Sequence, residues 1–167
     1  ANCSVQSQSA PPSDMPVSPS IDYQSKLNSI AVERVKLAAE YRQSTNKKAI
    51  IEKAGKYFVS SIYNDIVPDW YGTDWDFYGT TETPRSGKIA CGYFVTTVLR
   101  DAGAKVQRVS LAQQASENII KSLTREPYIK RFQNAPIEKF VGEIKALGEG
   151  LYLVGLDVHV GFILHDG

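Results

Sequence analysis

Apolar residues recur at helical spacing over the first part of the chain. From Asp22 onward the spacing predicts an amphipathic helix with one face toward a core. A second helix is predicted from a cap at Ser44 or Thr45, and it should end by Val67 because Pro68 disfavours helical geometry in the preceding residue. The predicted core-facing positions are Leu27, Ile30, Val35 and Ala38 in the first helix and Ile50, Ile51, Ala54, Phe58 and Ile62 in the second.

Three more helices are predicted in the second half of the chain. The first covers 91–102 and stops at Gly103, and the second is capped by Ser110 and continues through 123. The third has Pro136 at its first position and ends at Gly148.

Two β-type runs follow these helices, over 151–154 and 158–164. Alternation along a strand sends successive side chains to opposite faces. In the second run one predicted face holds Val158, Val160, Phe162 and Leu164, and the other holds His159, Gly161 and Ile163.

The chain divides into a leader and one domain. Residues 1–21 are rich in Ser, Pro and Gln, so they cannot bury enough apolar surface to offset the entropy of ordering, and we expect a flexible tether. Residues 22–167 form the predicted domain, with helices over 22–67 and a second part over 69–167.

Aromatic residues are concentrated in the predicted loop over 69–87. They either pin this long loop to the domain or form the wall of a substrate groove, since aromatic side chains give rigid contact area in concave sites. The candidate substrate-binding residues are Trp70, Tyr71, Trp75 and Tyr78.

Composition excludes several classes of function. Nineteen basic residues stand against eighteen acidic ones, which gives a formal charge of +1 and no support for binding to nucleic acid. No apolar stretch approaches the roughly 20 residues of a membrane helix. The two Cys and two His residues lack the spacing of zinc ligands, and no phosphate-binding loop is present, so we expect no metal and no cofactor.

Cys91 and His159 are the candidate catalytic residues. Cys91 opens a predicted helix, where unpaired N–H groups and the helix dipole favour a thiolate. An imidazole supplied by a later strand would act as base and then as acid, and backbone N–H groups would hold the oxyanion. The alternative for each residue is structural, because a lone Cys on a helix can be a small buried apolar group and a lone His a hydrogen-bonded strand residue.

Three segments resemble the NlpC-like cell-wall cysteine peptidases. Residues 87–95 read Gly-Lys-Ile-Ala-Cys-Gly-Tyr-Phe-Val and resemble the nucleophile segment of that family. Residues 145–153 are similar to its first strand, and 159–164, His-Val-Gly-Phe-Ile-Leu, to the strand that carries its base. The resemblance spans about 69–167 and implies an α+β, papain-like NlpC-type domain with helices packed on a small antiparallel sheet.

The chain departs from the family pattern on both sides of the nucleophile. Gly92 follows Cys91 where the family usually has Ser, and Ala90 precedes it where the family usually has Asp. The family's third catalytic residue follows the histidine strand, so we expect it beyond Gly167. Asp157 and His165 are poor substitutes, since one lies beside His159 on the same strand and the other is six residues away.

The resemblance implies a cysteine hydrolase that cleaves amide bonds in peptidoglycan peptides, with Cys91 as nucleophile and His159 as general base and acid. The alternatives are a cysteine amidase or acyltransferase acting on another substrate, and a non-catalytic binding module with the same fold. We expect a monomer in the cell envelope or secreted, with a membrane tether through a lipidated Cys3 as one option and a stray leader cysteine as the other.

Overall fold

The computed structural model describes residues 23–167. The predicted leader and Cys3 lie outside the described residues. The elements, in chain order, are α1 (Tyr23–Gln43), α2 (Lys47–Ser60), the π-helical turn η1 (Ser61–Ile66), α3 (Val67–Trp70), β1 (Asp74–Trp75), β2 (Lys88–Ile89), α4 (Cys91–Asp101), α5 (Arg108–Ala112), α6 (Ser116–Leu123), the 3-10 turn η2 (Glu126–Tyr128), α7 (Ile137–Leu147), β3 (Gly150–Gly155) and β4 (Val160–His165).

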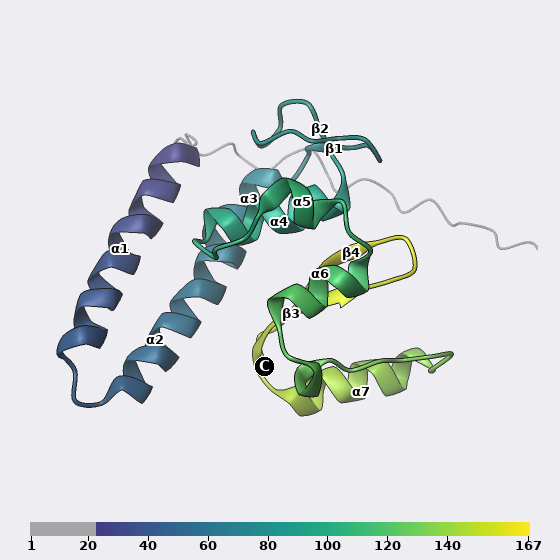
Figure 1. Ribbon diagram of the computed structural model, residues 1–167. Coiled ribbons are helices and arrows are strands. Elements are labelled where there is room, and N and C mark those ends of the chain that lie inside the picture. Colours follow the sequence, from purple (N-terminus) through teal and green to yellow (C-terminus); the bar gives the residue numbers. More distant parts are fainter. Residues whose placement is uncertain (1–22) are drawn as a thin grey trace, which may run out of the picture.

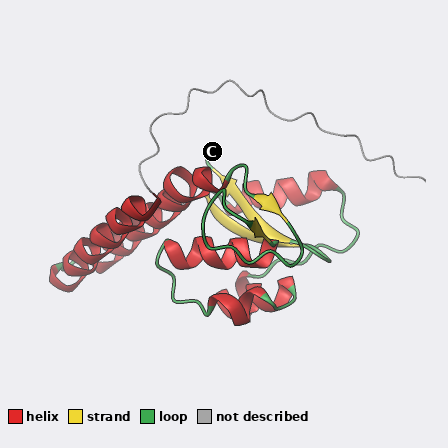
Figure 2. Ribbon diagram, turned by 90° about the horizontal axis from the view of Figure 1, so that it is seen from above, coloured by secondary structure: helices red, strands yellow, loops and turns green. Residues whose placement is uncertain are grey.

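Helices surround a small sheet, and a pair of long helices projects from this body (Figure 1). β3 and β4 pair antiparallel with Gly155 opposite Val160 at the turn end, and β1 and β2 form a short parallel pair. In Figure 2 the yellow strands lie between red helices, with α1 and α2 extending to one side. The expected α+β class, with helices packed on a small antiparallel sheet, is confirmed at this level.

α4 is the central element of the core. Val95, Thr96, Thr97 and Val98 in its middle are fully buried. Aromatic rings cross the core in a series of edge-to-face contacts, with centroid distances of 6.3 Å from Tyr23 to Trp70, 6.0 Å from Trp70 to Phe94 and 6.2 Å from Phe94 to Phe162. We call these four rings the aromatic series. Each such pair adds about 0.5–1.5 kcal/mol beyond the burial of its area.

The predicted end of the second helix is wrong. Instead of stopping before Pro68, the chain stays helical from α2 through η1 to Trp70. The N–H of Val67 donates to the carbonyl of Ile62, five residues back, so the α-helical hydrogen-bond pattern is already interrupted before Pro68. Pro68 then lies in the first turn of α3, where a missing N–H costs nothing.

Several local predictions also need correction. In α1 the buried side chains are those of Ile30 and Leu37, whereas Val35, which was predicted to face the core, is 67% exposed. The cap of α2 is Asn46, whose side chain accepts a hydrogen bond from the N–H of Ala49. A cap residue must have non-helical backbone geometry. Ser44, Thr45 and Asn46 are all suitable residue types, so the sequence alone does not tell which of them is the cap.

The predicted helix over 110–123 is two helices, and Ser110 lies inside α5 rather than at a cap. The helix after Pro136 ends at Gly148 as predicted, where the backbone has a φ of +89° that suits glycine. Pro136 is the cap of α7, one position earlier than expected. In the described part of the chain no helix is long and apolar enough to cross a membrane.

Tyr23 joins the start of α1 to the end of α4. Its hydroxyl donates to Asp101 Oδ2 at 2.8 Å and accepts from Trp70 Nε1 at 3.1 Å. Burial raises the pKa of the Tyr23 hydroxyl well above its usual range, although the hydrogen bond from Trp70 opposes the shift. The protonated phenol therefore stabilises the fold.

We predict a loss of stability at high pH that depends on Tyr23. The folded pKa is raised, so its contribution is complete below about 10 and is lost as the pH rises above that value, by at most about 1.4 kcal/mol per pH unit. Urea unfolding of Tyr23→Phe should lack this part of the pH dependence, whereas Tyr78→Phe, at an 85% exposed position, should retain it. Equal pH dependence in both variants would contradict the prediction.

Candidate active site

Cys91 is the first residue of α4, and its helix terminus has no side-chain cap. Ala90 at the cap position has extended geometry and offers no polar side chain. Its carbonyl accepts from the N–H of Phe94 at 2.8 Å, which starts the helical ladder. The first N–H groups of α4 therefore remain for a ligand or for solvent, and the helix dipole places partial positive charge there.

The Cys91 side chain belongs to the face of α4 that packs toward the sheet. Phe94 and Val95 follow it at i+3 and i+4, the positions that share a helix face. Val95 is fully buried, and Phe94 contacts Phe162 of β4. Cys91 itself is a free thiol, partly buried against this core.

Gly92 is required by a close backbone contact. A Cβ atom at this position would lie 2.3 Å from the carbonyl oxygen of Ala112, the last residue of α5. Backbone does not yield as a flexible side chain does, so any larger residue must push the two helices apart. The contact gives a physical reason for glycine where the NlpC-like pattern usually has serine.

His159 lies in the β3–β4 turn and not within a strand, so the strand predicted from Val158 begins two residues too early. β4 starts at Val160. The N–H of Leu156 donates to the carbonyl of His159 at 2.8 Å and closes the turn, and Val158 at its tip is 88% exposed. The imidazole is exposed to solvent. The predicted alternation of faces therefore does not set the direction of this side chain.

A series of contacts links this turn, through α6 and α5, to the N-terminal end of α4. α5 runs back along α4, so that Ala112 meets Gly92, and a short connection leads to Ser116 at the start of α6. Ser116 Oγ donates to the carbonyl of Leu156 at 2.9 Å. Figure 1 shows the yellow β3–β4 turn beside the start of α6. Within residues 23–167, no hydrogen bond joins the side chains of Cys91 and His159.

The two residues considered as substitutes for a third catalytic member are not placed to orient His159. His165 is at the far end of β4, where its Nδ1 lies 2.6 Å from the carbonyl oxygen of Gly148. Asp157 is exposed in the turn, and the described residues show no hydrogen bond between its carboxylate and the imidazole.

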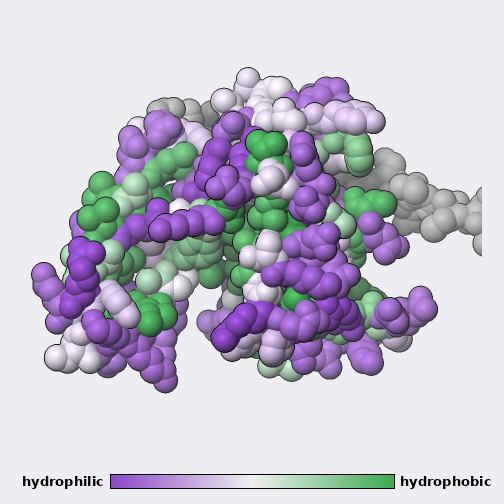
Figure 3. Space-filling model, in the orientation of Figure 1, coloured by the Kyte–Doolittle hydropathy of each residue, from purple (hydrophilic) through white to green (hydrophobic). Residues whose placement is uncertain are grey.

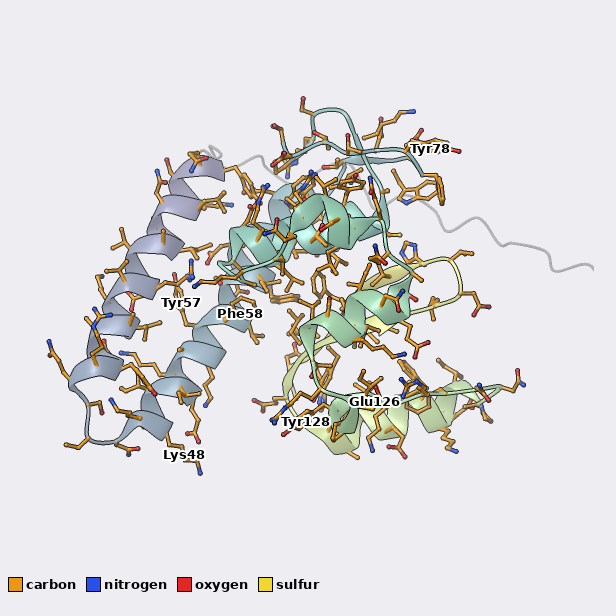
Figure 4. All side chains as sticks on the ribbon, in the orientation of Figure 1. Lys48, Tyr57, Phe58, Tyr78, Glu126 and Tyr128 are labelled. Carbon is orange, nitrogen blue, oxygen red and sulfur yellow. The ribbon has the colours of Figure 1, made fainter. Side chains whose placement is uncertain are left out.

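The aromatic candidates separate into one core residue and three surface residues. Trp70 is 4% exposed and belongs to the aromatic series, so its ring surface serves packing. Tyr71, Trp75 and Tyr78 are 64%, 61% and 85% exposed. Figure 4 places Tyr78 at the outer end of the loop above α4, pointing away from the body.

The loop that carries Tyr78 is fixed against the segment preceding Cys91. The carbonyl of Gly79 accepts from the N–H of Ala90 at 2.8 Å, and the N–H of Thr81 donates to the carbonyl of Lys88 at 3.0 Å. A Cβ on Gly79 would lie 2.5 Å from the backbone of Ile89, so only glycine permits this approach. We call residues 76–82 the site loop.

Arg108 joins the site loop to α4, and sequence reasoning missed it. Its side chain is 8% exposed. Its Nε donates to Thr97 Oγ1 at 2.7 Å, and its Nη2 donates to the carbonyls of Thr80 and Thr81, each at 2.9 Å. An isolated arginine in an otherwise ordinary stretch carries no pattern that marks it as buried.

Glu82 completes the charge balance around Arg108. Its carboxylate lies 3.6 Å from Arg108 and also pairs with Arg100 of α4. The hydrogen bond from Arg100 lowers the pKa of Glu82, so the carboxylate remains ionised opposite the two guanidinium groups.

An apolar hollow lies elsewhere. It has a volume of about 370 Å³ and lies between α1, α2 and the end of α4. Its wall includes Leu37, Ala54 and Phe58. Figure 3 shows green apolar side chains along this helix pair, and Figure 4 shows Phe58 projecting from α2 toward the body. None of the residues around Cys91 lines it.

Comparisons with protein-family models, with curated proteins and with solved structures found no match. Within residues 23–167, no group of three or more His, Cys, Asp or Glu side chains is placed to hold a metal ion.

We predict that Gly92→Ala lowers the free energy of unfolding by about 1–3 kcal/mol, because the added methyl group meets the Ala112 carbonyl. The matched control is Gly55→Ala in α2, where nothing lies within 4 Å of the added methyl group. That variant should be more stable by about 0.5–1 kcal/mol, since alanine favours helix. Urea unfolding measures both, and stabilisation by the two changes alike would refute the contact.

Proposed function

We propose that the protein is a cysteine hydrolase of amide bonds, with Cys91 as nucleophile and His159 as general base and acid. The observation that carries the proposal is the free thiol of Cys91 at the start of α4, where no side chain caps the helix. The approach of Ala112 to Gly92 and the hydrogen bond from Ser116 to Leu156 connect this end of α4, through α5 and the start of α6, to the turn that holds His159.

The proposed reaction uses these groups in a fixed order. His159 accepts the thiol proton, and the Cys91 thiolate attacks the acyl carbon of the amide. N–H groups at the start of α4 stabilise the oxyanion. The C–N bond then breaks as His159 returns the proton to the leaving amine, and water, deprotonated by His159, hydrolyses the thioester.

Peptidoglycan peptides are the proposed substrate, in line with the resemblance to NlpC-like peptidases, whose papain-like domain we propose for residues 69–167. The exposed aromatic side chains of Tyr71, Trp75 and Tyr78 offer contact area for such a substrate. A location in the cell envelope belongs to the same proposal. An amidase or acyltransferase with another substrate uses the same chemistry.

We expect the rate of alkylation to reveal an activated Cys91. In a Cys3→Ser background, iodoacetamide should label Cys91 at neutral pH faster than it labels free cysteine, because a thiolate reacts and a thiol does not. His159→Ala should slow labelling, because the imidazolium partner of the thiolate is lost. The matched control is His165→Ala, the other histidine of the hairpin, whose ring is held at Gly148 and should not affect the rate.

The enzyme proposal fails if Cys91 labels no faster than free cysteine and if His159→Ala leaves the rate unchanged. Mass analysis of purified peptidoglycan after digestion tests the substrate. New amine and carboxyl ends in wild type, absent from Cys91→Ser, support peptidoglycan cleavage. Fast labelling without cleavage favours another amide substrate, and binding without either favours a non-catalytic module.

A further inference from the structure

We infer that Arg108 is a positioning residue, which holds the site loop against α4 and so fixes the turn from which Cys91 reacts. This inference rests on the proposed function. Arg108 is a buried cation outside the proposed chemistry, and from the start of α5 it contacts both the site loop and the middle of α4.

The guanidinium group makes directional hydrogen bonds to both the site loop and α4. Its planar fork of donors contacts Thr97 on α4 and two consecutive carbonyls of the loop, Thr80 and Thr81. It also stacks over the ring of Tyr93, 4.8 Å from the ring centroid, two residues after Cys91. These directional contacts hold only when the loop and the helix keep their present separation and orientation.

The loop transmits this constraint to Cys91 through the backbone. Thr80 bridges Ile89, and the Gly79 carbonyl accepts from the N–H of Ala90, so the residues just before Cys91 are paired with the loop. If the loop moves, the direction in which the chain enters α4 moves with it. The N–H groups that would hold the thiolate and the oxyanion are those of this first turn.

Stability alone does not explain a buried arginine. Well-packed apolar residues often replace buried ion pairs without loss of stability. A guanidinium group that donates to several fixed acceptors contributes orientation as well, because its hydrogen bonds are directional. The contacts of Arg108 are therefore suited to fixing the position of the site loop relative to α4.

The test compares Arg108→Met with Arg100→Met in the Cys3→Ser background. Arg100 is the matched control, because it also pairs with Glu82 but belongs to α4 and makes no contact with the Thr80 and Thr81 carbonyls. The first readout is amide hydrogen exchange at Thr81 and Ala90, normalised to buried amides in the middle of α4. The second is the pH profile of Cys91 alkylation.

We expect Arg108→Met to lose protection at the Thr81 and Ala90 amides while the middle of α4 stays protected. The rate of Cys91 alkylation at neutral pH should fall by roughly tenfold or more, because small displacements of a reacting group lower its rate strongly. The pH at which alkylation becomes fast should rise. Arg108→Lys should behave in the same way, since it keeps the charge but loses the fork. Arg100→Met should change neither readout.

If Arg108→Met does not fold, Thr97→Val takes its place, since it removes one acceptor of the fork on α4 at constant shape. Unchanged exchange at Thr81 and Ala90, or an unchanged alkylation profile in a folded variant, overturns the inference. Slow labelling of wild-type Cys91 refutes the proposed function instead. Fast labelling in both wild type and Arg108→Met refutes only the positioning role.

Discussion

The contact between α4 and β4 through Phe94 and Phe162 holds the rest of the molecule in place. It is the last link of the aromatic series that begins at Tyr23, so one set of edge-to-face contacts joins the first described helix to the last strand. The main sheet has only two strands, so packing of side chains in the core, more than strand pairing, joins segments far apart in sequence. The face of α4 that makes this contact is also the face that begins with Cys91.

Polar groups surround this apolar core and hold α4 at both ends. Tyr23 hydrogen-bonds Asp101 at its last residue, while Arg108 holds its middle to the site loop. At its first turn, Gly92 lets the backbone of Ala112 approach. Buried polar groups of this kind require complete partners, and no buried side-chain nitrogen or oxygen in the described residues lacks one. The candidate site thus lies at the end of an element held along its whole length.

The sequence predicted the presence of α1, the bounds of α4 to within one residue and the end of α7 at Gly148. It placed Val158 and His159 in the second strand, because the two residues extend the alternating pattern that continues from Val160, whereas the turn includes both of them. Arg108 and the burial of Trp70 could not be predicted, since both depend on tertiary partners distant in the chain. Cys91 at a helix start was predicted, but the contact of Gly92 with Ala112 of α5 was not, because it depends on a partner distant in the chain.

The π-helical turn η1 has a consequence for chain length. A turn with hydrogen bonds five residues back holds one more residue than the α-helical ladder would, and so rotates everything after it relative to everything before. Ile62 and Ile66 within it are fully buried, and Trp70 follows at the same interval. Removing a single residue here would restore a regular helix and turn Trp70 away from Phe94. The number of residues in this segment is therefore constrained as strictly as the identity of its side chains. Insertions and deletions should be tolerated in the surface loops more readily than between Ser60 and Trp70.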